Sequence, residues 1–205
     1  VSAALVTGLS ACGNAGNNAS TAGGNTSTAE AGSTGATKDT LAVGLAAAPQ
    51  TLNPVTAGDA VSWQIIFGSY EALVTGQEVE NNGNTYVDRT EIGPDLATSW
   101  EQDGETYTFH LNEEAVFANG DPVTADDFLA SVKYYEENNN LMYLLMDVAS
   151  IEAVDEHTVQ ITINKPNDLF LSCLSNIYVL NTKQIEGGDV SWLDTHTAGT
   201  GPYVV

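Results

Sequence analysis

Two stretches in which apolar and polar residues alternate are the clearest local features of the sequence. The first runs from Leu96 to Leu111 and is interrupted at Gln102-Asp103-Gly104, which contains the Asp-Gly pair favoured in tight turns. The second runs from Ile151 to Asn164 and is interrupted at residues 155–157. Alternation with a period of two places the apolar residues on one face of a strand. Each stretch therefore predicts a β-hairpin with one buried face.

Spacings of three and four residues predict helices elsewhere. Between Ala60 and Leu73, Val61, Ile65 and Leu73 itself fall on one side of a helix, and neighbouring aromatic and aliphatic residues broaden that face. One of these neighbours, Trp63, is expected to pack in the core rather than to stack on a ligand. A shorter helical stretch runs from Asp168 to Leu174.

A further helix is predicted between the two hairpins, directly after Val123. Thr124 is the expected N-cap, and Asp127 stands where the acidic residue of a capping box would lie, although its side chain is shorter than the usual Glu. The asparagines at 138–140 end the pattern. The predicted buried stripe of this helix consists of Phe128, Val132 and Tyr135.

Shorter segments complete the predicted set of elements. Leu41–Leu45 and Thr85–Ile92 read as strands, Pro49–Pro54 as a turn between prolines, and Asn81–Gly83 as a loop. No period of 20–50 residues repeats, which excludes a solenoid. We therefore expect a mixed fold, α+β or α/β.

Charge narrows the classes of function. The chain has 205 residues, with 27 Asp or Glu against 5 Lys or Arg, for a formal net charge of −22. Binding nucleic acid or an anionic membrane by charge needs a basic patch, so neither is expected as a partner. Most of the carboxylates are expected to form a solvated surface. The five basic residues are Lys38, Arg89, Lys133, Lys165 and Lys183.

The first residues point to a lipid anchor. An apolar run of small residues leads into Leu9-Ser10-Ala11-Cys12, which matches the bacterial lipobox, and the run is similar to the end of a secretory signal. We expect residues 1–12 to comprise the end of a lipoprotein signal peptide and the lipobox, with cleavage before Cys12 and the lipid on Cys12. Acyl chains then tether a protein to the membrane without a spanning helix.

Residues 13–40 have the composition of a flexible polar linker. Nearly every residue up to Lys38 is Gly, Ala, Ser, Thr or Asn. Such a segment cannot bury enough apolar surface to offset its chain entropy. A lipobox followed by a polar linker and then by patterned sequence is what a tethered extracytoplasmic domain requires.

Residues with catalytic or metal-binding chemistry are scattered. His110, His157 and His196 lack the spacing of metal ligands, and Cys173 lies in an apolar segment as a small buried residue without a disulfide partner. The sequence contains no Gly-x-Ser-x-Gly, no His-Glu-x-x-His and no phosphate-binding glycine loop. We expect no enzymatic activity, no metal site and no cofactor.

The order of motifs after residue 40 resembles one family, the solute-binding proteins of ABC importers for oligopeptides, dipeptides and nickel. Asn112 departs from the pattern, because the family usually has Arg after the strand leucine. The matching segments, in the order of the family, are Leu41–Gly44, Pro49–Pro54, Tyr70–Leu73, Pro94–Glu101, Asp103–Leu111, Val116–Phe128, Val154–Val159 and Gly199–Tyr203.

The resemblance implies a two-lobed clamshell that closes on its ligand. Members of the family are typically far longer, so residues 41–205 would be an incomplete N-terminal lobe that includes an inserted domain from about Ala60 to Leu174. Without the opposing lobe, we expect this part to fold incompletely or to expose apolar surface. A compact, protease-resistant domain over residues 41–205 would contradict this expectation.

The resemblance also implies which residues face the ligand. They are the loop Thr56, Ala57, Gly58 and Asp59, and the segment Ser175-Asn176 after the last predicted helix. Asp59 could bind an amine of the ligand or cap the following helix, and we favour the cap because helices commonly start with Asp.

The function implied is that of a lipoprotein on the outer side of the bacterial cell membrane, at the cell surface or in the periplasm. It would capture peptides, or a similar small-molecule ligand, and deliver them to the permease subunits of an ABC importer. Alternatives within the family are nickel chelates, opines or oligosaccharides. The alternative outside it is a secreted lipoprotein sensor, adhesin or enzyme on a similar scaffold.

Overall fold

The computed structural model describes residues 40–138, 145–185 and 190–205. The expected signal peptide with Cys12, and the linker up to residue 39, lie outside the described residues. The chain divides into two units, Val1–Ala42 and Val43–Val205, and the fold described below is that of the second.

A four-stranded antiparallel sheet forms one layer of this unit, with strand order β3-β4-β6-β5. Both predicted hairpins are confirmed, because β3 pairs with β4 and β5 pairs with β6. Every second residue of β4 and of β6 is buried, as the alternation predicts, and Phe109 lies opposite Val159. The strands are β3 (Ala97–Asp103), β4 (Thr106–Leu111), β5 (Val148–Asp155) and β6 (Thr158–Ile163).

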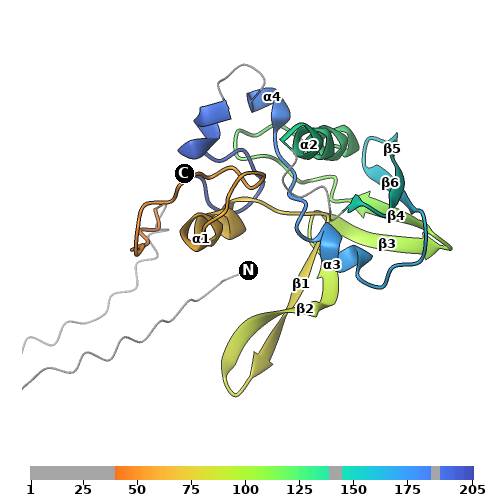
Figure 1. Ribbon diagram of the computed structural model, residues 1–205, viewed down its shortest axis with the longest axis horizontal. Coiled ribbons are helices and arrows are strands. Elements are labelled where there is room, and N and C mark those ends of the chain that lie inside the picture. Colours follow the sequence, from red (N-terminus) through yellow and green to blue (C-terminus); the bar gives the residue numbers. More distant parts are fainter. Residues whose placement is uncertain (1–39, 139–144, 186–189) are drawn as a thin grey trace, which may run out of the picture. The chain divides into compact units, whose positions relative to one another are not determined.

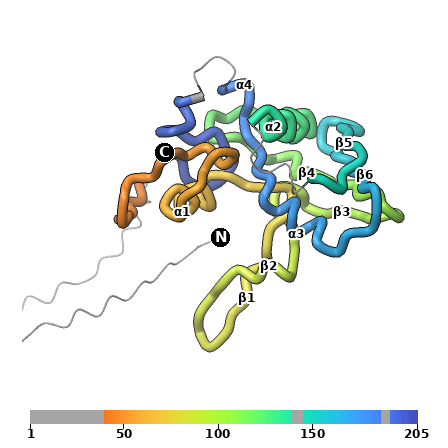
Figure 2. The backbone as a smooth tube through the Cα atoms, viewed as in Figure 1, coloured from red at the N-terminus to blue at the C-terminus, as the bar shows by residue number. Residues whose placement is uncertain are grey.

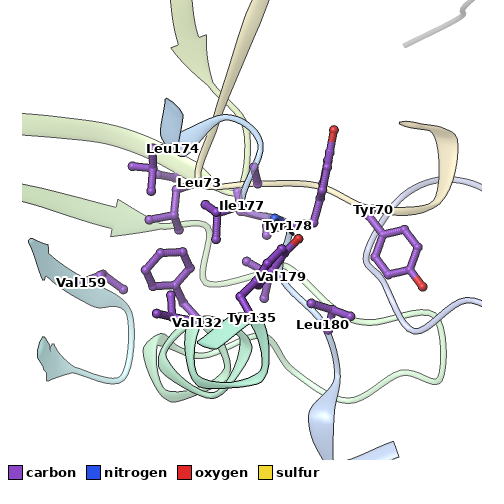
Figure 3. Close-up of a cluster of buried hydrophobic side chains, with 14 of the residues drawn as sticks. Tyr70, Leu73, Val132, Tyr135, Val159, Leu174, Ile177, Tyr178, Val179 and Leu180 are labelled. Carbon is purple, nitrogen blue, oxygen red and sulfur yellow. Dashed lines mark hydrogen bonds between the residues drawn. The ribbon is translucent and has the colours of Figure 1, made fainter. Parts of the chain in front are cut away.

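Helix α2 (Ala125–Asn138) packs against β5 and β6, and the predicted stripe of three apolar residues is buried. Two of them, Val132 and Tyr135, are labelled in Figure 3. The expected role of Asp127 at the start of α2 is also confirmed. Its carboxylate accepts hydrogen bonds from the backbone N–H and the hydroxyl of Thr124, at 3.0 and 2.7 Å. Lys183 Nζ lies 3.2 Å from the other oxygen of this buried carboxylate, so the charge is paired.

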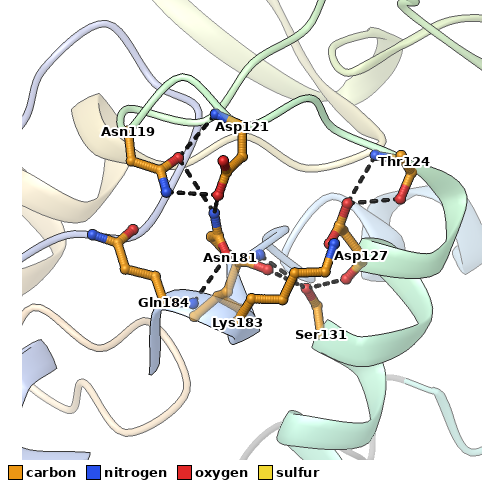
Figure 4. Close-up of polar contacts among 9 residues, drawn as sticks. Asn119, Asp121, Thr124, Asp127, Ser131, Asn181, Lys183 and Gln184 are labelled. Atoms are coloured by element: carbon orange, nitrogen blue, oxygen red, sulfur yellow. Dashed lines mark hydrogen bonds and ion pairs between the residues drawn. The ribbon is translucent and has the colours of Figure 1, made fainter. Parts of the chain in front are cut away.

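Leu180 and Asn181, late in the chain, contact α2 and the turn before it (Figure 4). The Ser131 hydroxyl accepts a hydrogen bond from the backbone N–H of Leu180, and Asn181 Nδ2 donates to Asp121 in the turn before α2. These contacts place the short helix α4 (Thr182–Ile185) beside α2, and the 3₁₀ helix η2 (Val190–Asp194) follows α4.

A second pair of strands, β1 (Val74–Asn81) and β2 (Asn84–Pro94), forms a long hairpin separate from the sheet (Figures 1 and 2). Its turn is Asn82-Gly83, and both residues have positive φ, as a tight hairpin turn requires. The predicted strand 85–92 lies within β2. Strand β1 was not predicted, because its sequence is mostly polar.

The first predicted helix is correct at its start and wrong at its end. Helix α1 (Ala60–Ser69) stops before Tyr70, which is extended, and Ala72 forms a bridge with Tyr178. The carbonyls of Ala72 and Leu73 accept hydrogen bonds from the N–H groups of residues 96 and 97. Tertiary pairing therefore overrides helix propensity here.

Three smaller predictions are also corrected. The buried face of α1 consists of Ser62, Ile66 and Ser69, whereas Val61 and Ile65 are only partly buried. Helix α3 (Phe170–Leu174) begins two residues later than expected. Leu41–Leu45 is not a strand: no pairing is assigned to it within the described residues, and a strand needs a partner for its backbone groups.

Residues 197–203 return to the end of α1 and approach it closely. The N–H of Gly201 donates to the carbonyl of Ser69 at 3.1 Å, and the N–H of Ala198 donates to the hydroxyl of Tyr70 at 3.1 Å. A Cβ on Gly201 would meet the backbone of Ser69 at 2.6 Å, so only glycine fits at this position.

Candidate functional site

A cavity of about 440 Å³ lies at the base of the β1–β2 hairpin. The hairpin, the end of α1 and the segment after α3 all contribute to it. Cavities of 300–1,000 Å³ are typical of small-molecule sites. The cavity is lined by Phe67, Tyr70, Glu71, Thr75, Gly76, Val87, Arg89, Asp95, Ser175, Tyr178 and Pro202.

Arg89, on β2, carries the positive charge of the cavity. Its guanidinium lies over the ring of Phe67, 5.5 Å from the ring centroid, and its Nη1 donates a hydrogen bond to Asn176 Oδ1 at 3.1 Å. Asn176 is oriented in turn, because its Nδ2 donates to the carbonyl of Ser172 at 2.9 Å. An aromatic face and an amide oxygen thus hold the guanidinium in place.

Two carboxylates, Asp95 and Glu71, share the cavity with Arg89. Asp95 Oδ2 accepts a hydrogen bond from the N–H of Ala72 at 2.9 Å, which fixes the chain between β2 and β3. The pKa of Asp95 is raised to about 7, mainly by burial and also by the nearby charge of Glu71, against the lowering effect of that hydrogen bond.

Aromatic side chains form much of the remaining wall. The Tyr178 ring lies 6.1 Å from that of Trp63 and 6.4 Å from that of Tyr70. Burial raises the pKa of Tyr178 to about 12, although Arg89 acts in the opposite direction. Trp63 packs partly buried against the core, as predicted. The Tyr70 and Tyr178 phenols are therefore protonated hydrogen-bonding groups at neutral pH.

The predicted loop residues 56–59 do not line this cavity. Asn53 holds the turn before them, because its Oδ1 accepts from the N–H of Val55 and its carbonyl accepts from the N–H groups of Thr56 and Ala57. The turn thus falls at residues 54–56, later than predicted. Thr56 and Gly58 are exposed, and Ala57 and Asp59 are partly buried.

Asp59 caps α1, as favoured from the sequence. Its Oδ1 accepts hydrogen bonds from the N–H groups of Val61 and Ser62, at 3.0 and 2.9 Å. Hydrogen bonds from the side chain and backbone of Ser62 lower the pKa of this carboxyl. Phe67 is eight residues further along the same helix, so at about 1.5 Å per residue the cap lies roughly 12 Å from the cavity wall.

Of the two other predicted residues, one lines the cavity and the other contacts Arg89. Ser175 is buried and lines it, and Asn176 orients Arg89. Phe67 and Arg89 themselves were not predicted as site residues from the sequence. Arg89 is the only arginine in the sequence, surrounded by acidic residues, and that contrast was the available signal.

Metal and membrane features are few in the part of the chain that is described. Within residues 40–138, 145–185 and 190–205, no group of three His, Cys, Asp or Glu side chains is placed to hold a metal ion. Cys173 is a free thiol and is only partly buried, less than expected. Among the helices of these same residues, none is long and apolar enough to cross a bilayer.

Comparison with known proteins identifies the family. Residues 91–205 match the bacterial extracellular solute-binding proteins, family 5, middle region. The chain belongs to this family. The resemblance seen in the sequence is thereby confirmed, and so is the mixed α and β fold of this solute-binding protein, which matches part of solved periplasmic binding proteins.

Two curated relatives and one solved structure illustrate the similarity. A protein named "Probable D,D-dipeptide-binding periplasmic protein DdpA", from Escherichia coli strain K12, is 34% identical over 82% of this chain and 33% of its own length. The oligopeptide-binding protein OppA of Bacillus subtilis is 29% identical over 65% of the chain and 26% of its own length. MoaA from A. tumefaciens R10, in complex with mannopinic acid, has a TM-score of 0.64 at 26% identity, covering 77% of the chain and 32% of MoaA. The chain spans about a third or less of the length of each.

Proposed function

We propose that this chain is part of an extracytoplasmic substrate-binding protein that captures short peptides for an ABC importer. The observation that carries the proposal is the family match over residues 91–205, and the peptide-binding names of DdpA and OppA support peptides as the ligand class. The cavity at the hairpin base offers a guanidinium, phenols and apolar walls, which suit hydrogen bonding and charge recognition of a small polar ligand.

Native mass spectrometry of the full-length protein, purified without refolding, tests the ligand class. We expect the protein to carry a series of masses that match short peptides and that leave on denaturation. A single non-peptide mass would instead assign another ligand. The similarity to MoaA makes a sugar–amino acid conjugate such as mannopinic acid the specific alternative.

Membrane attachment through Cys12 is a second part of the proposal. The lipobox and the polar segment that follows it support an anchored protein on the outer side of the membrane. Replacing Cys12 with Ala should release the protein from the membrane fraction and abolish labelling by a radioactive fatty acid. Labelling that persists in the variant would contradict the anchor.

The loop Thr56–Asp59 and the pair Ser175-Asn176 remain proposed ligand-facing positions. Ligand binding would then be completed by the rest of the full-length protein, with closure favoured only by the difference in ligand affinity between open and closed forms. Limited proteolysis of residues 41–205 tests the proposed division into lobes. Rapid digestion is expected if this part is incomplete by itself.

A further inference from the structure

Arg89 differs from the other basic side chains of the described residues. Lys133, Lys165 and Lys183 each lie within 4.0 Å of a carboxylate oxygen, of Glu137, Asp147 and Asp127 respectively. The ring and the amide that hold Arg89 are both neutral. Glu71 and Asp95 line the same cavity, but the groups that hold the guanidinium in place carry no charge.

The contacts of the guanidinium leave some of its in-plane donors available. A guanidinium has five N–H donors in a planar fork that matches the two oxygens of a carboxylate. Asn176 Oδ1 accepts a bond from Nη1, the Tyr178 phenol is a second polar neighbour, and the Phe67 ring covers one face, where it does not compete for the in-plane donors. These contacts reduce the freedom that the side chain would lose on binding an anion.

We infer that Arg89 binds a carboxylate group of the ligand inside this cavity. The inference rests on the function proposed above and deepens it, because it specifies a peptide, or similar ligand, with a free carboxylate. Glu71 and Asp95 line the same cavity and would repel a ligand with several negative charges. The ligand class is therefore one with a single carboxylate at this position.

A matched pair of libraries tests the inference. The full-length protein is mixed with an equimolar tripeptide library in free-acid form, and separately with the same library as C-terminal amides, and bound peptides are quantified by native mass spectrometry. Wild-type protein should bind the free acids about 10- to 100-fold more tightly than the amides, which is the range for a lost hydrogen bond to a charged group.

Variants of Arg89 locate this preference. Arg89→Gln should lower affinity for the free acids by the same factor and leave affinity for the amides within about threefold. Arg89→Lys should restore part of the preference, because it keeps the charge and loses the fork. Lys133→Gln is the matched control: it removes the same charge from an exposed side chain on α2, and it should change neither affinity.

Each outcome decides between the two proposals. If wild-type protein binds acids and amides equally, or if Arg89→Gln keeps the preference, the inference about Arg89 is overturned while peptide capture stands. If neither library binds, both are overturned. Because Arg89 is exposed, its variants should keep the wild-type melting temperature, which confirms that any loss of affinity is local.

Discussion

The four-stranded sheet and the β1–β2 hairpin are both antiparallel, but they are stabilised differently. In β4 and β6 every second residue is buried, and α2 packs against β5 and β6. In β2 nearly every residue up to the base of the hairpin is exposed, including Tyr86 and Val87. The hairpin depends on its own ladder, its tight turn and a few contacts with α3 and β3.

This difference indicates that the sheet and the hairpin have different roles. The sheet and α2 bury the large side chains that supply most of the stability. The hairpin buries little, and a two-stranded hairpin is marginally stable in isolation. Its base supplies Val87, Arg89 and part of the cavity wall. Substitutions in the sheet should therefore mainly change the stability of the protein, whereas substitutions in the hairpin should mainly change ligand recognition.

The largest expected difference comes from removing one aromatic side chain in each region. Phe128→Ala deletes a fully buried ring of α2 and should lower the free energy of unfolding by about 3–5 kcal/mol. Tyr86→Ala removes a ring that is 48% exposed on β2 and should change it by less than about 0.5 kcal/mol. Urea titrations measure both values. Similar losses in the two variants would remove the distinction between the regions.

Asp95 lies where the hairpin joins the sheet, and the pH dependence of stability tests its contribution there. Its pKa is raised from 3.8 to about 7, so between these values the folded state holds a proton that the unfolded state has lost. The contribution of Asp95 therefore makes the free energy of unfolding fall as pH rises from about 4 to 7, by an amount on the order of 2–4 kcal/mol.

Asp95→Asn should remove this dependence and make the protein more stable than wild type at pH 8. The amide oxygen can still accept the hydrogen bond from Ala72. Thermal melts of both proteins from pH 4 to 8 measure the difference, which isolates Asp95 because the carboxyls with lowered pKa, such as Asp59 and Asp121, act in both proteins. A constant difference across this range would refute the assignment.

A smaller and local effect is expected at the bulge of the hairpin. A Cβ on Gly76 would meet the Asp88 carbonyl oxygen at 2.9 Å, where the register of β1 and β2 shifts. Gly76→Ala should open the hairpin at a cost of about 1–3 kcal/mol. Hydrogen exchange should then quicken at the amides of β1 and β2 and stay unchanged in β4 and β6. Glu80→Ala, at an exposed position of β1, is the control that should alter neither set.

The smallest effect is expected at the other end of α1. Asp59→Ala removes the helix cap and should lower the free energy of unfolding by about 1 kcal/mol. Peptide affinity should stay unchanged if Asp59 is only a cap. Asp59→Asn keeps the cap without the charge and should restore stability. A loss of affinity in both variants would favour the amine-binding role.

The elements that were predicted correctly are those whose structure follows from neighbouring residues in the sequence. Alternation with a turn pair identified both sheet hairpins, and Asp59 and Asp127 marked the starts of two helices. The predictions that were wrong or missing concern segments whose structure depends on contacts with distant parts of the chain. The segment after Ser69 has a helical pattern but bonds to residues 96 and 97, and β1 is mostly polar because only its first and third residues are buried.

The site was harder to predict, because its parts come from segments far apart in sequence. Ser175 and Asn176 were predicted to face the ligand only through the resemblance to the family; in the structure Ser175 lines the cavity and Asn176 contacts Arg89. The role of Arg89 depends on a contact with a residue 87 positions away and on a ring at the end of α1. The acidic residues around Arg89 set it apart in the sequence, but they do not indicate which distant side chains it contacts.

The Asn82-Gly83 turn has a practical consequence. It is exposed at the tip of the hairpin, six residues from Arg89, which at about 3.3 Å per strand residue is roughly 20 Å along the same strand. Exposed loop tips tolerate insertion. A fluorophore or a second domain inserted there would be attached to the strand that carries Arg89 and would not contact the buried core. The hairpin tip is therefore a suitable attachment site for an optical biosensor.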